Sequence, residues 1–311
     1  MTQPQPPVSA PDRAPASRTR APDVSENALR GITLLLLAEM LFATMDTIAK
    51  HLGQEMPVPM VAWGRYAFHL GFMLMLFPGR RLKPLLKVNN VKLTLVRGVL
   101  LLMATMSFFT AIRYIPLADA VAISFVAPLF VVALSIPLLG ERVGPRRWAA
   151  VLIGLAGVMV IVRPGFGDVH WAYGLMLFMA LVFAVFVIVT RMLTRTEETM
   201  SILFYAALMG TIGTSAMLPF FWQTPTLEQV GWMAAMGAIG GVSQLLMINA
   251  YKVATASTLA PFQYIQIIFA AFWGYLIFGD FPDYWVIAGG TIVIVSGLYV
   301  MHREATLAKK G

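Results

Sequence analysis

Two acidic residues and a lysine lie in an otherwise apolar stretch near the start of the chain, LAEMLFATMDTIAKHL. Glu39, Asp46 and Lys50 are seven and four residues apart, so a helix places all three on one face. An ionised side chain at a membrane centre costs at least about 2.5–3.5 kcal/mol, so this face must meet protein or water. Because carboxyl groups take up protons more readily in apolar surroundings, Glu39 and Asp46 are predicted to bind a substrate or a proton. The alternative is an Asp46–Lys50 ion pair, with Glu39 reaching the membrane interface.

A second group of polar residues, Arg65, Tyr66 and His69, lies in the next apolar stretch. Arginine stays protonated, so an Arg65 that faces a cavity must pair with an acid or with a substrate anion. Asp46 and Glu39 are the acids of the neighbouring stretch. Histidine titrates near neutral pH, which makes His69 a candidate coupling residue. The alternative for His69 is a packing role held by hydrogen bonds.

A third group lies near the other end of the chain, where Gln263, Tyr264 and Gln266 interrupt an apolar run. Amide groups can pair with the donors and acceptors of a heteroaromatic or amide substrate, and a tyrosine ring can stack on it. We therefore expect these side chains to face a cavity. The alternative is hydrogen bonding between helices, worth about 0.6 kcal/mol on average in membranes. Pro128 and Pro261 each remove a backbone hydrogen bond, so they are predicted to kink their helices and to permit gating.

Membrane-spanning helices must position these residues. The chain has 311 residues, of which 59% are hydrophobic and 12% charged, with a mean hydropathy of +0.75. Soluble domains are about 45–50% apolar and about 25% charged. We predict an all-α integral membrane protein with ten transmembrane helices, each near the length that crosses a bilayer. The predicted spans are residues 29–49, 58–78, 92–114, 117–139, 146–163, 172–192, 200–222, 229–251, 255–278 and 284–301.

The basic residues indicate how the chain is oriented. Eighteen of the 23 Lys and Arg residues fall in the tails and in alternate connections, and only Lys50, Arg113 and Arg163 fall in the others. Cytoplasmic loops carry this excess, so both termini are predicted to lie in the cytoplasm. Arg97 is interpreted as an anchor at the membrane interface. The net charge of +8 is accounted for by topology and does not indicate nucleic-acid binding. The expected location is a bacterial-type cytoplasmic membrane.

The chain contains an internal repeat. The segment AIRYIPLADAVAISFVAPLF, from residue 111, aligns with AYKVATASTLAPFQYIQIIF, from residue 250, at an offset of 139 residues. The predicted repeats are residues 29–165 and 171–304, with a disordered cytoplasmic tail at 1–27 and a second cytoplasmic tail at 305–311. Each repeat holds five spans, so the second must cross the membrane upside down relative to the first. Inverted repeats are typical of transporters that alternate between two states.

Short motifs follow one another along the spans: Arg65–Tyr66, Arg97–Gly98, Ala111–Ile112–Arg113–Tyr114, Pro128, Gly140–Glu141, Gly154, Gly157 and the run LAPFQYIQIIFAAFWGYLIFGDFPD. With these features the chain resembles the drug/metabolite transporter superfamily, specifically its EamA-type ten-helix members. The run in the second half also resembles the subgroup that includes S-adenosylmethionine and riboflavin uptake proteins. The resemblance implies a central cavity lined by spans 1–4 and 6–9, with spans 5 and 10 at the periphery as the candidate homodimer contact.

We therefore predict a secondary transporter that moves a small organic metabolite by alternating access, without a cofactor or a metal site. The metabolite could be cofactor-like, as riboflavin or S-adenosylmethionine is, or amino-acid-like. Three other classes were weighed. An enzyme is disfavoured because the GxGD at Gly165–Asp168 lies in a connection, and no HExxH, GxSxG or P-loop motif occurs. A channel would need a filter segment. A flippase for a lipid or lipid-linked sugar, or an exporter, is the alternative that stays open.

Overall fold

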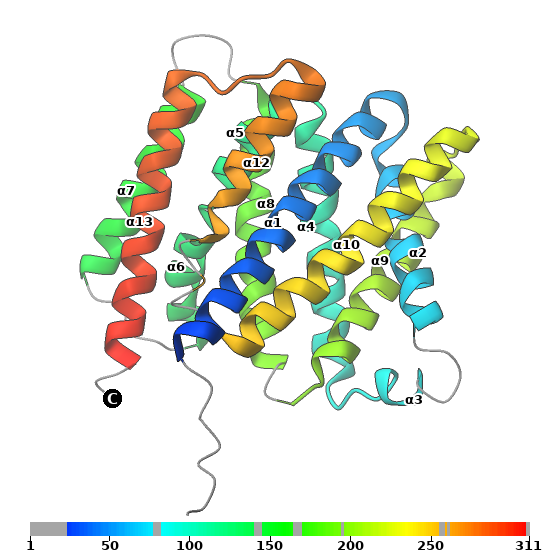
Figure 1. Cartoon of the computed structure of the whole chain (residues 1–311), viewed down its shortest axis with the longest axis horizontal. Coiled ribbons are helices and arrows are strands. Elements are labelled where there is room, and N and C mark those ends of the chain that lie inside the picture. Colours follow the sequence, from blue (N-terminus) through cyan, green and yellow to red (C-terminus); the bar gives the residue numbers. More distant parts are fainter. Residues whose placement is uncertain are drawn as a thin grey trace, which may run out of the picture.

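The computed structural model describes residues 24–76, 82–139, 145–163, 170–193, 196–254, 259 and 262–308, and every element in these ranges is a helix (Figure 1). The predicted sites at Pro261, Gly140–Glu141 and Gly165–Asp168 lie outside the described residues. The first-half helices are α1 (Val24–Glu55), α2 (Val58–Leu76), α3 (Leu82–Leu85), α4 (Val91–Ile112), α5 (Leu117–Ser124), α6 (Ala127–Leu139) and α7 (Pro145–Val162). The second-half helices are α8 (Trp171–Leu193), α9 (Thr199–Phe221), α10 (Leu227–Val253), α12 (Ile265–Trp273), the π-helix η2 (Gly274–Phe278) and α13 (Tyr284–Ala308).

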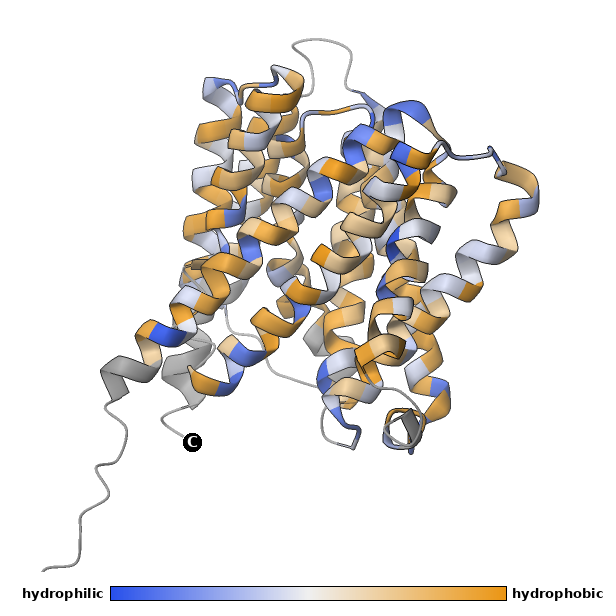
Figure 2. Cartoon of the chain, turned by 45° about the vertical axis from the view of Figure 1, so that its right-hand side comes forward, coloured by the Kyte–Doolittle hydropathy of each residue, from blue (hydrophilic) through white to orange (hydrophobic). Residues whose placement is uncertain are grey.

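Six of the helical segments in the described part of the chain are long and apolar enough to cross a membrane. They lie in α1, α4, α8, α9 and α10 and in the combined segment Leu117–Leu134. Three further apolar helices are shorter, at Trp148–Val162, Ile265–Phe278 and Tyr284–Tyr299. The chain is therefore an all-helical, multi-pass membrane protein. Figure 2 illustrates this composition, because most of each ribbon is coloured as hydrophobic and many of the hydrophilic residues lie near the helix ends.

The helix boundaries differ from the predicted spans at three places. Helix α1 begins at Val24 and α13 ends at Ala308, so parts of both predicted polar tails are helical. The predicted span 117–139 is not continuous, because α5 ends at Ser124 and α6 begins at Ala127. Two backbone hydrogen bonds, from Leu129 and Phe130 to the carbonyl of Val126, start the new helix.

The two halves of the sequence are interleaved in the bundle. Helix α1 packs against α10 and α12, α2 packs against α9 and α10, and α4 packs against α8 and α9. Each of these contacts joins a first-half helix to a second-half helix. Helix α1 begins and α13 ends at the same end of the bundle (Figure 1), which we call the terminal end; the other is the opposite end.

Helices α7 and α13 lie side by side at one edge of the bundle (Figure 1). They approach closely through glycines: a Cβ atom added to Gly289 would lie 2.5 Å from the carbonyl oxygen of Gly157. At the other side, a Cβ atom on Gly237 of α10 would lie 2.5 Å from the Cβ of Phe68 in α2. Small residues let helix backbones approach where no hydrophobic effect drives them together.

Candidate functional site

The two acids of α1 are both buried in the bundle. Glu39 is 5% exposed and Asp46 is 6% exposed, so the shared helical face turns away from lipid. Gln266 of α12 donates from Nε2 to Oδ2 of Asp46 across 3.4 Å. The structure thus joins one predicted acid of the first half to one predicted amide of the second half.

Lys50 does not pair with Asp46, so that structural alternative was wrong. Its ammonium group lies 2.7 Å from Oδ2 of Asp280, in the turn between η2 and α13. It also donates to the carbonyl oxygen of Ile115 across 3.2 Å and lies 4.8 Å from the ring centre of Phe278. The lysine is directed towards the opposite end of the bundle, which leaves Asp46 without a cation beside it on α1.

Arg65 of α2 is partly buried and has no acid within 4 Å among the described residues. Its one hydrogen bond, from Nη1 to Oγ1 of Thr105 in α4, is long at 3.4 Å. The guanidinium lies 5.5 Å from the ring centre of Tyr66 and 5.4 Å from that of Phe109.

Tyr66, next to Arg65 in α2, packs against α4 and α9. Its hydroxyl group lies 2.6 Å from Oγ1 of Thr105, and the side chain is 3% exposed. A Cβ atom on Gly210 of α9 would lie 2.4 Å from the Tyr66 ring, so the ring packs directly on that helix. Tyr66 therefore holds α2 against α4 and α9.

His69 lies one turn from Arg65 and faces α10. A Cβ atom on Gly241 would lie 3.6 Å from its Nε2 atom. His69 and Gln244 line a cavity of about 20 Å³, which is room for about one water molecule. No hydrogen bond to its side chain occurs within the described ranges, so the hydrogen-bonded packing role has no partner there.

The structure separates the three residues that were predicted to face one cavity from the span 255–278. Gln266 reaches Asp46, whereas Gln263 donates from Nε2 to the hydroxyl of Tyr251 across 2.8 Å. The ring of Tyr264 lies 4.6 Å from that of Phe125, centre to centre, and its buried hydroxyl has no hydrogen-bond partner among the residues that the structure describes.

Pro128 lies in the first turn of α6, directly after the break that separates α5 from α6. The break spans Phe125 and Val126, and Ser124 caps the end of α5 by donating to the carbonyl of Val121 across 2.7 Å. Proline has no N–H to continue the hydrogen-bond ladder of the preceding helix.

Sequence reasoning missed three partners. Asp280 was not considered as a partner of Lys50, although a lysine in an apolar span requires an acid. Asp119 accepts a hydrogen bond from the Tyr173 hydroxyl at 2.8 Å, and an acid inside the span 117–139 was the available signal. Thr105 gave no signal, because threonines are common in membrane helices.

Arg97 is not an interfacial anchor. It is 6% exposed, donates from Nε to Oγ1 of Thr190 across 2.8 Å and from Nη1 to the carbonyl of Ile202 across 3.2 Å. Its guanidinium lies 4.5 Å from the ring centre of Phe186. Arg97 therefore joins α4 to α8 and α9 as a structural residue.

The arrangement suits solute binding. Arg65 offers a cation without an acid partner among the described residues, Asp46 and Glu39 offer two buried carboxyl groups, and Gln266 offers an amide. The described residues contain no group of three or more His, Asp or Glu that could hold a metal ion.

Comparison with known proteins identifies the family. The sequence pattern of the EamA-like transporter family matches this chain twice, at residues 29–163 and at residues 170–302. The chain belongs to the EamA-like transporter family. The resemblance predicted from the sequence is confirmed, and the family is one of transporters.

Relatives of this EamA-family chain are named for different solutes. It is 27% identical over 280 residues to an S-adenosylmethionine uptake transporter of Rickettsia bellii, covering 90% of this chain and 96% of that one. It is 30% identical over 271 residues to the pseudopaline exporter CntI of Pseudomonas aeruginosa, covering 86% and 94%. It is 25% identical over 292 residues to a riboflavin transporter of Vibrio cholerae, covering 92% and 98%.

A solved crystal structure shares the fold. It superposes with a TM-score of 0.55 at 21% sequence identity, covering 92% of this chain and 98% of the other. At this identity the likeness concerns the fold alone.

Proposed function

We propose that this protein is a secondary transporter for a small organic metabolite, working by alternating access in a bacterial-type cytoplasmic membrane. Family membership supports the transporter class, and similar relatives are named an S-adenosylmethionine uptake transporter, a pseudopaline exporter and a riboflavin transporter. The substrate is cofactor-like or amino-acid-like, as the relatives' names suggest. The other partners are the bilayer and, through the α7–α13 edge, a second copy of the chain.

The proposed topology has ten spans in two inverted five-span repeats, with both termini in the cytoplasm. Six long apolar helices and three shorter ones support it, and α2 supplies the remaining span. An even number of crossings agrees with α1 beginning and α13 ending at the same end of the bundle (Figure 1). The excess of Lys and Arg at that end supports its assignment to the cytoplasm.

Two helix breaks support alternating access. Phe125 and Tyr264 are equivalent in the repeat alignment. Phe125 lies in the two-residue break before α6, Tyr264 directly precedes α12, and the centres of their rings lie 4.6 Å apart. Broken helices at a repeat interface are typical of secondary transporters. Pro128 and Pro261 are proposed to make these breaks the points at which the halves bend.

The main support for a substrate site here is the environment of Arg65. This cation is partly buried and has no acid within 4 Å among the described residues. A substrate anion would complete it, because a guanidinium binds carboxylates and phosphates in a planar, two-pronged geometry. Asp46, Glu39 and Gln266 would bind the cationic or polar part of the same solute. His69 is proposed as a coupling residue next to this site.

The test of the site is transport by purified, reconstituted protein. The substrate is first found as the metabolite that stabilises the protein in a panel of riboflavin, S-adenosylmethionine, amino acids and lipid-linked phosphates. Binding at one hundred times Kd adds about 2.7 kcal/mol. Arg65→Ala and Asp46→Asn are expected to abolish transport while the protein stays folded, and Arg30→Ala, at the exposed start of α1, is the matched control. Wild-type flux in both site variants would remove the site.

Export is the second candidate direction, because the most identical relative named above is an exporter, at 30% identity. Right-side-out and inside-out vesicles distinguish the directions by the side from which the solute is taken up. A stabilising lipid-linked phosphate, with no effect of the soluble metabolites, would instead point to a flippase.

Proton coupling through Asp46 and Glu39 belongs to the proposal. A charge held in the bundle is costly, so a carboxyl group that gains a proton in one state and loses it in the other can drive the cycle. Uptake against a gradient should then collapse with a protonophore. Flux that is indifferent to pH and to the protonophore would end this part of the proposal.

A further inference from the structure

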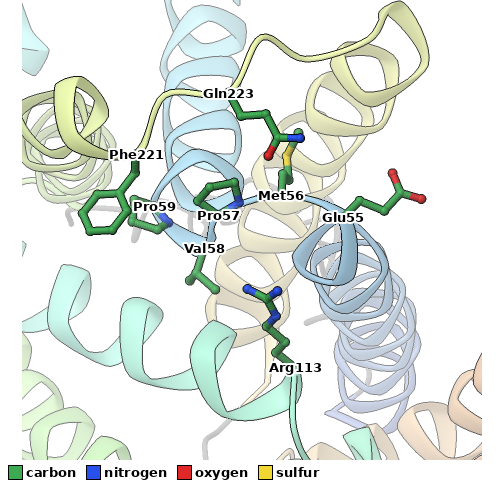
Figure 3. Close-up of a pocket in the computed structure, with 8 residues that line it drawn as sticks. All are labelled: Glu55, Met56, Pro57, Val58, Pro59, Arg113, Phe221 and Gln223. Atoms are coloured by element: carbon green, nitrogen blue, oxygen red, sulfur yellow. The ribbon is translucent and has the colours of Figure 1, made fainter.

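A second pocket lies at the turn from α1 to α2, and neither Arg65 nor Asp46 is among its lining residues (Figure 3). Its volume is about 370 Å³, within the range of about 300–1,000 Å³ that small-molecule sites occupy. The turn from α1 to α2 forms one wall, the end of α4 supplies Arg113, and the end of α9 with the next connection supplies Phe221 and Gln223.

Arg113 is directed into this pocket, with its guanidinium towards Met56 and Pro57 (Figure 3). Within the described part of the chain, the guanidinium makes no hydrogen bond and no ion pair. Its one recorded side-chain contact is with the ring of Tyr114, whose centre is 6.0 Å away. The backbone beneath it is fixed, because its carbonyl accepts a hydrogen bond from Nε2 of Gln54 at 3.1 Å.

The acid that shares the pocket does not neutralise Arg113. Oε2 of Glu55 accepts a hydrogen bond from Nε2 of Gln229 at 2.9 Å, and Oε1 lies 3.8 Å from Nε2 of His51. The Glu55 carboxylate points away from Arg113 in Figure 3. Glu55 is therefore bound to α10 and to its own helix, and the guanidinium faces open space.

The start of α2 adds to the positive potential of the pocket. Val58 and Pro59, the first residues of this 19-residue helix, line it. Pro59 has no N–H, and the N–H groups of Met60 and Val61 donate to the carbonyl of Pro57 at 2.9 and 3.3 Å, so the start of α2 contributes its helix dipole rather than a set of open N–H groups. The side chains of Met56, Pro57 and Phe221 make the rest of the wall largely apolar.

We propose that this pocket is an anion-binding site at the mouth of the transport pathway, which holds the carboxylate of a small metabolite against Arg113 and the start of α2. The inference rests on the proposed transport function and adds to it a second, peripheral position for an acidic solute. The solute's apolar part would lie against Phe221 and Met56. In the proposed orientation this mouth opens on the side away from the cytoplasm.

The chain has no cysteine, so a thiol introduced at Gln223 reports on the pocket alone. We would measure its reaction rates with a sulfonate-bearing and with a trimethylammonium-bearing methanethiosulfonate reagent, in purified Gln223→Cys protein. A unit charge about 7 Å away in water changes each rate about threefold in opposite directions. The ratio of the anionic to the cationic rate should therefore fall about sevenfold when Arg113→Gln is added. Tyr284→Cys, exposed at the same end, should keep its ratio in both backgrounds.

A second experiment tests whether the pocket binds an anion, beyond the electrostatic effect of Arg113 on the labelling rate. Succinate, compared with sodium chloride at equal ionic strength, should slow labelling of Gln223→Cys but not of Gln223→Cys/Arg113→Gln. A rate ratio unaffected by Arg113→Gln, or labelling that succinate does not slow, would each overturn the proposal. Neither readout requires transport, so failure here leaves the Arg65 site untouched, and failure of Arg65→Ala to affect flux leaves this pocket untouched.

Discussion

The ion pair between Lys50 and Asp280 gives the sharpest prediction about stability. It joins α1 of the first half to the turn before α13 of the second half across 2.7 Å. The two side chains are not equally buried: Lys50 is 7% exposed and Asp280 is 34% exposed. Removing the acid therefore leaves a buried charge, whereas removing the lysine leaves a carboxylate that water already reaches.

The magnitude follows from this asymmetry. Breaking a fully buried pair costs about 3–5 kcal/mol, and an exposed pair contributes about 0–1 kcal/mol. Asp280→Asn should lower the free energy of unfolding by about 2 kcal/mol, because Lys50 keeps the Ile115 carbonyl and the Phe278 ring as partners. Lys50→Met should cost only about 1 kcal/mol. The double variant should cost less than the sum, by a coupling energy of about 1 kcal/mol.

The assay is reversible unfolding of the purified protein in mixed micelles, followed by the loss of helical circular dichroism. Asp283→Asn is the matched control, because Asp283 also pairs across the halves, with Arg163, but both side chains are more than a third exposed. Asparagine can still cap α13 as Asp283 does through Oδ1. This control should cost less than about 1 kcal/mol.

Two results would refute the reasoning. The first is a double variant whose loss equals the sum of the single losses to within about 0.3–0.5 kcal/mol, which means that the two side chains do not interact. The second is a larger loss of unfolding free energy for Lys50→Met than for Asp280→Asn. That result would mean that the charge of Lys50 is not the one that the ion pair stabilises against burial.

Three further predictions concern packing and capping. Gly289→Ala should destabilise the protein by about 1–3 kcal/mol, because the added Cβ would lie 2.5 Å from the carbonyl oxygen of Gly157. Gly174→Ala is the control in the same unfolding assay. Its added Cβ would meet none of the neighbouring atoms within 4 Å, so this change should be neutral or stabilising. Tyr264→Phe should leave the unfolding free energy unchanged or raise it, since its buried hydroxyl has no partner; a clear loss would show that the hydroxyl is bonded. Glu197→Gln should cost about 1–2 kcal/mol, because its carboxylate accepts backbone N–H groups at the start of α4 at 2.8–2.9 Å, and faster hydrogen exchange at that helix end would locate the effect.

Local pattern was enough to establish the class of the protein and part of its site. The apolar runs identify a helical membrane protein, and the order of the short motifs identifies the EamA family. The seven-residue spacing of Glu39 and Asp46 predicts a shared, inward face, and both side chains are buried. These properties follow from hydropathy and from the 3.6-residue helical period, which depend only on residues near one another in the sequence.

The partners of those residues were decided only by tertiary structure. Lys50 had an acid four residues away, yet it pairs with Asp280, 230 residues further along the chain. Tyr264 and Gln266 lie two residues apart, yet one meets Phe125 and the other Asp46. Helical spacing fixes the direction of a side chain around its own axis but not which helix stands opposite. In a bundle whose two halves interleave, that choice comes from packing between helices far apart in sequence.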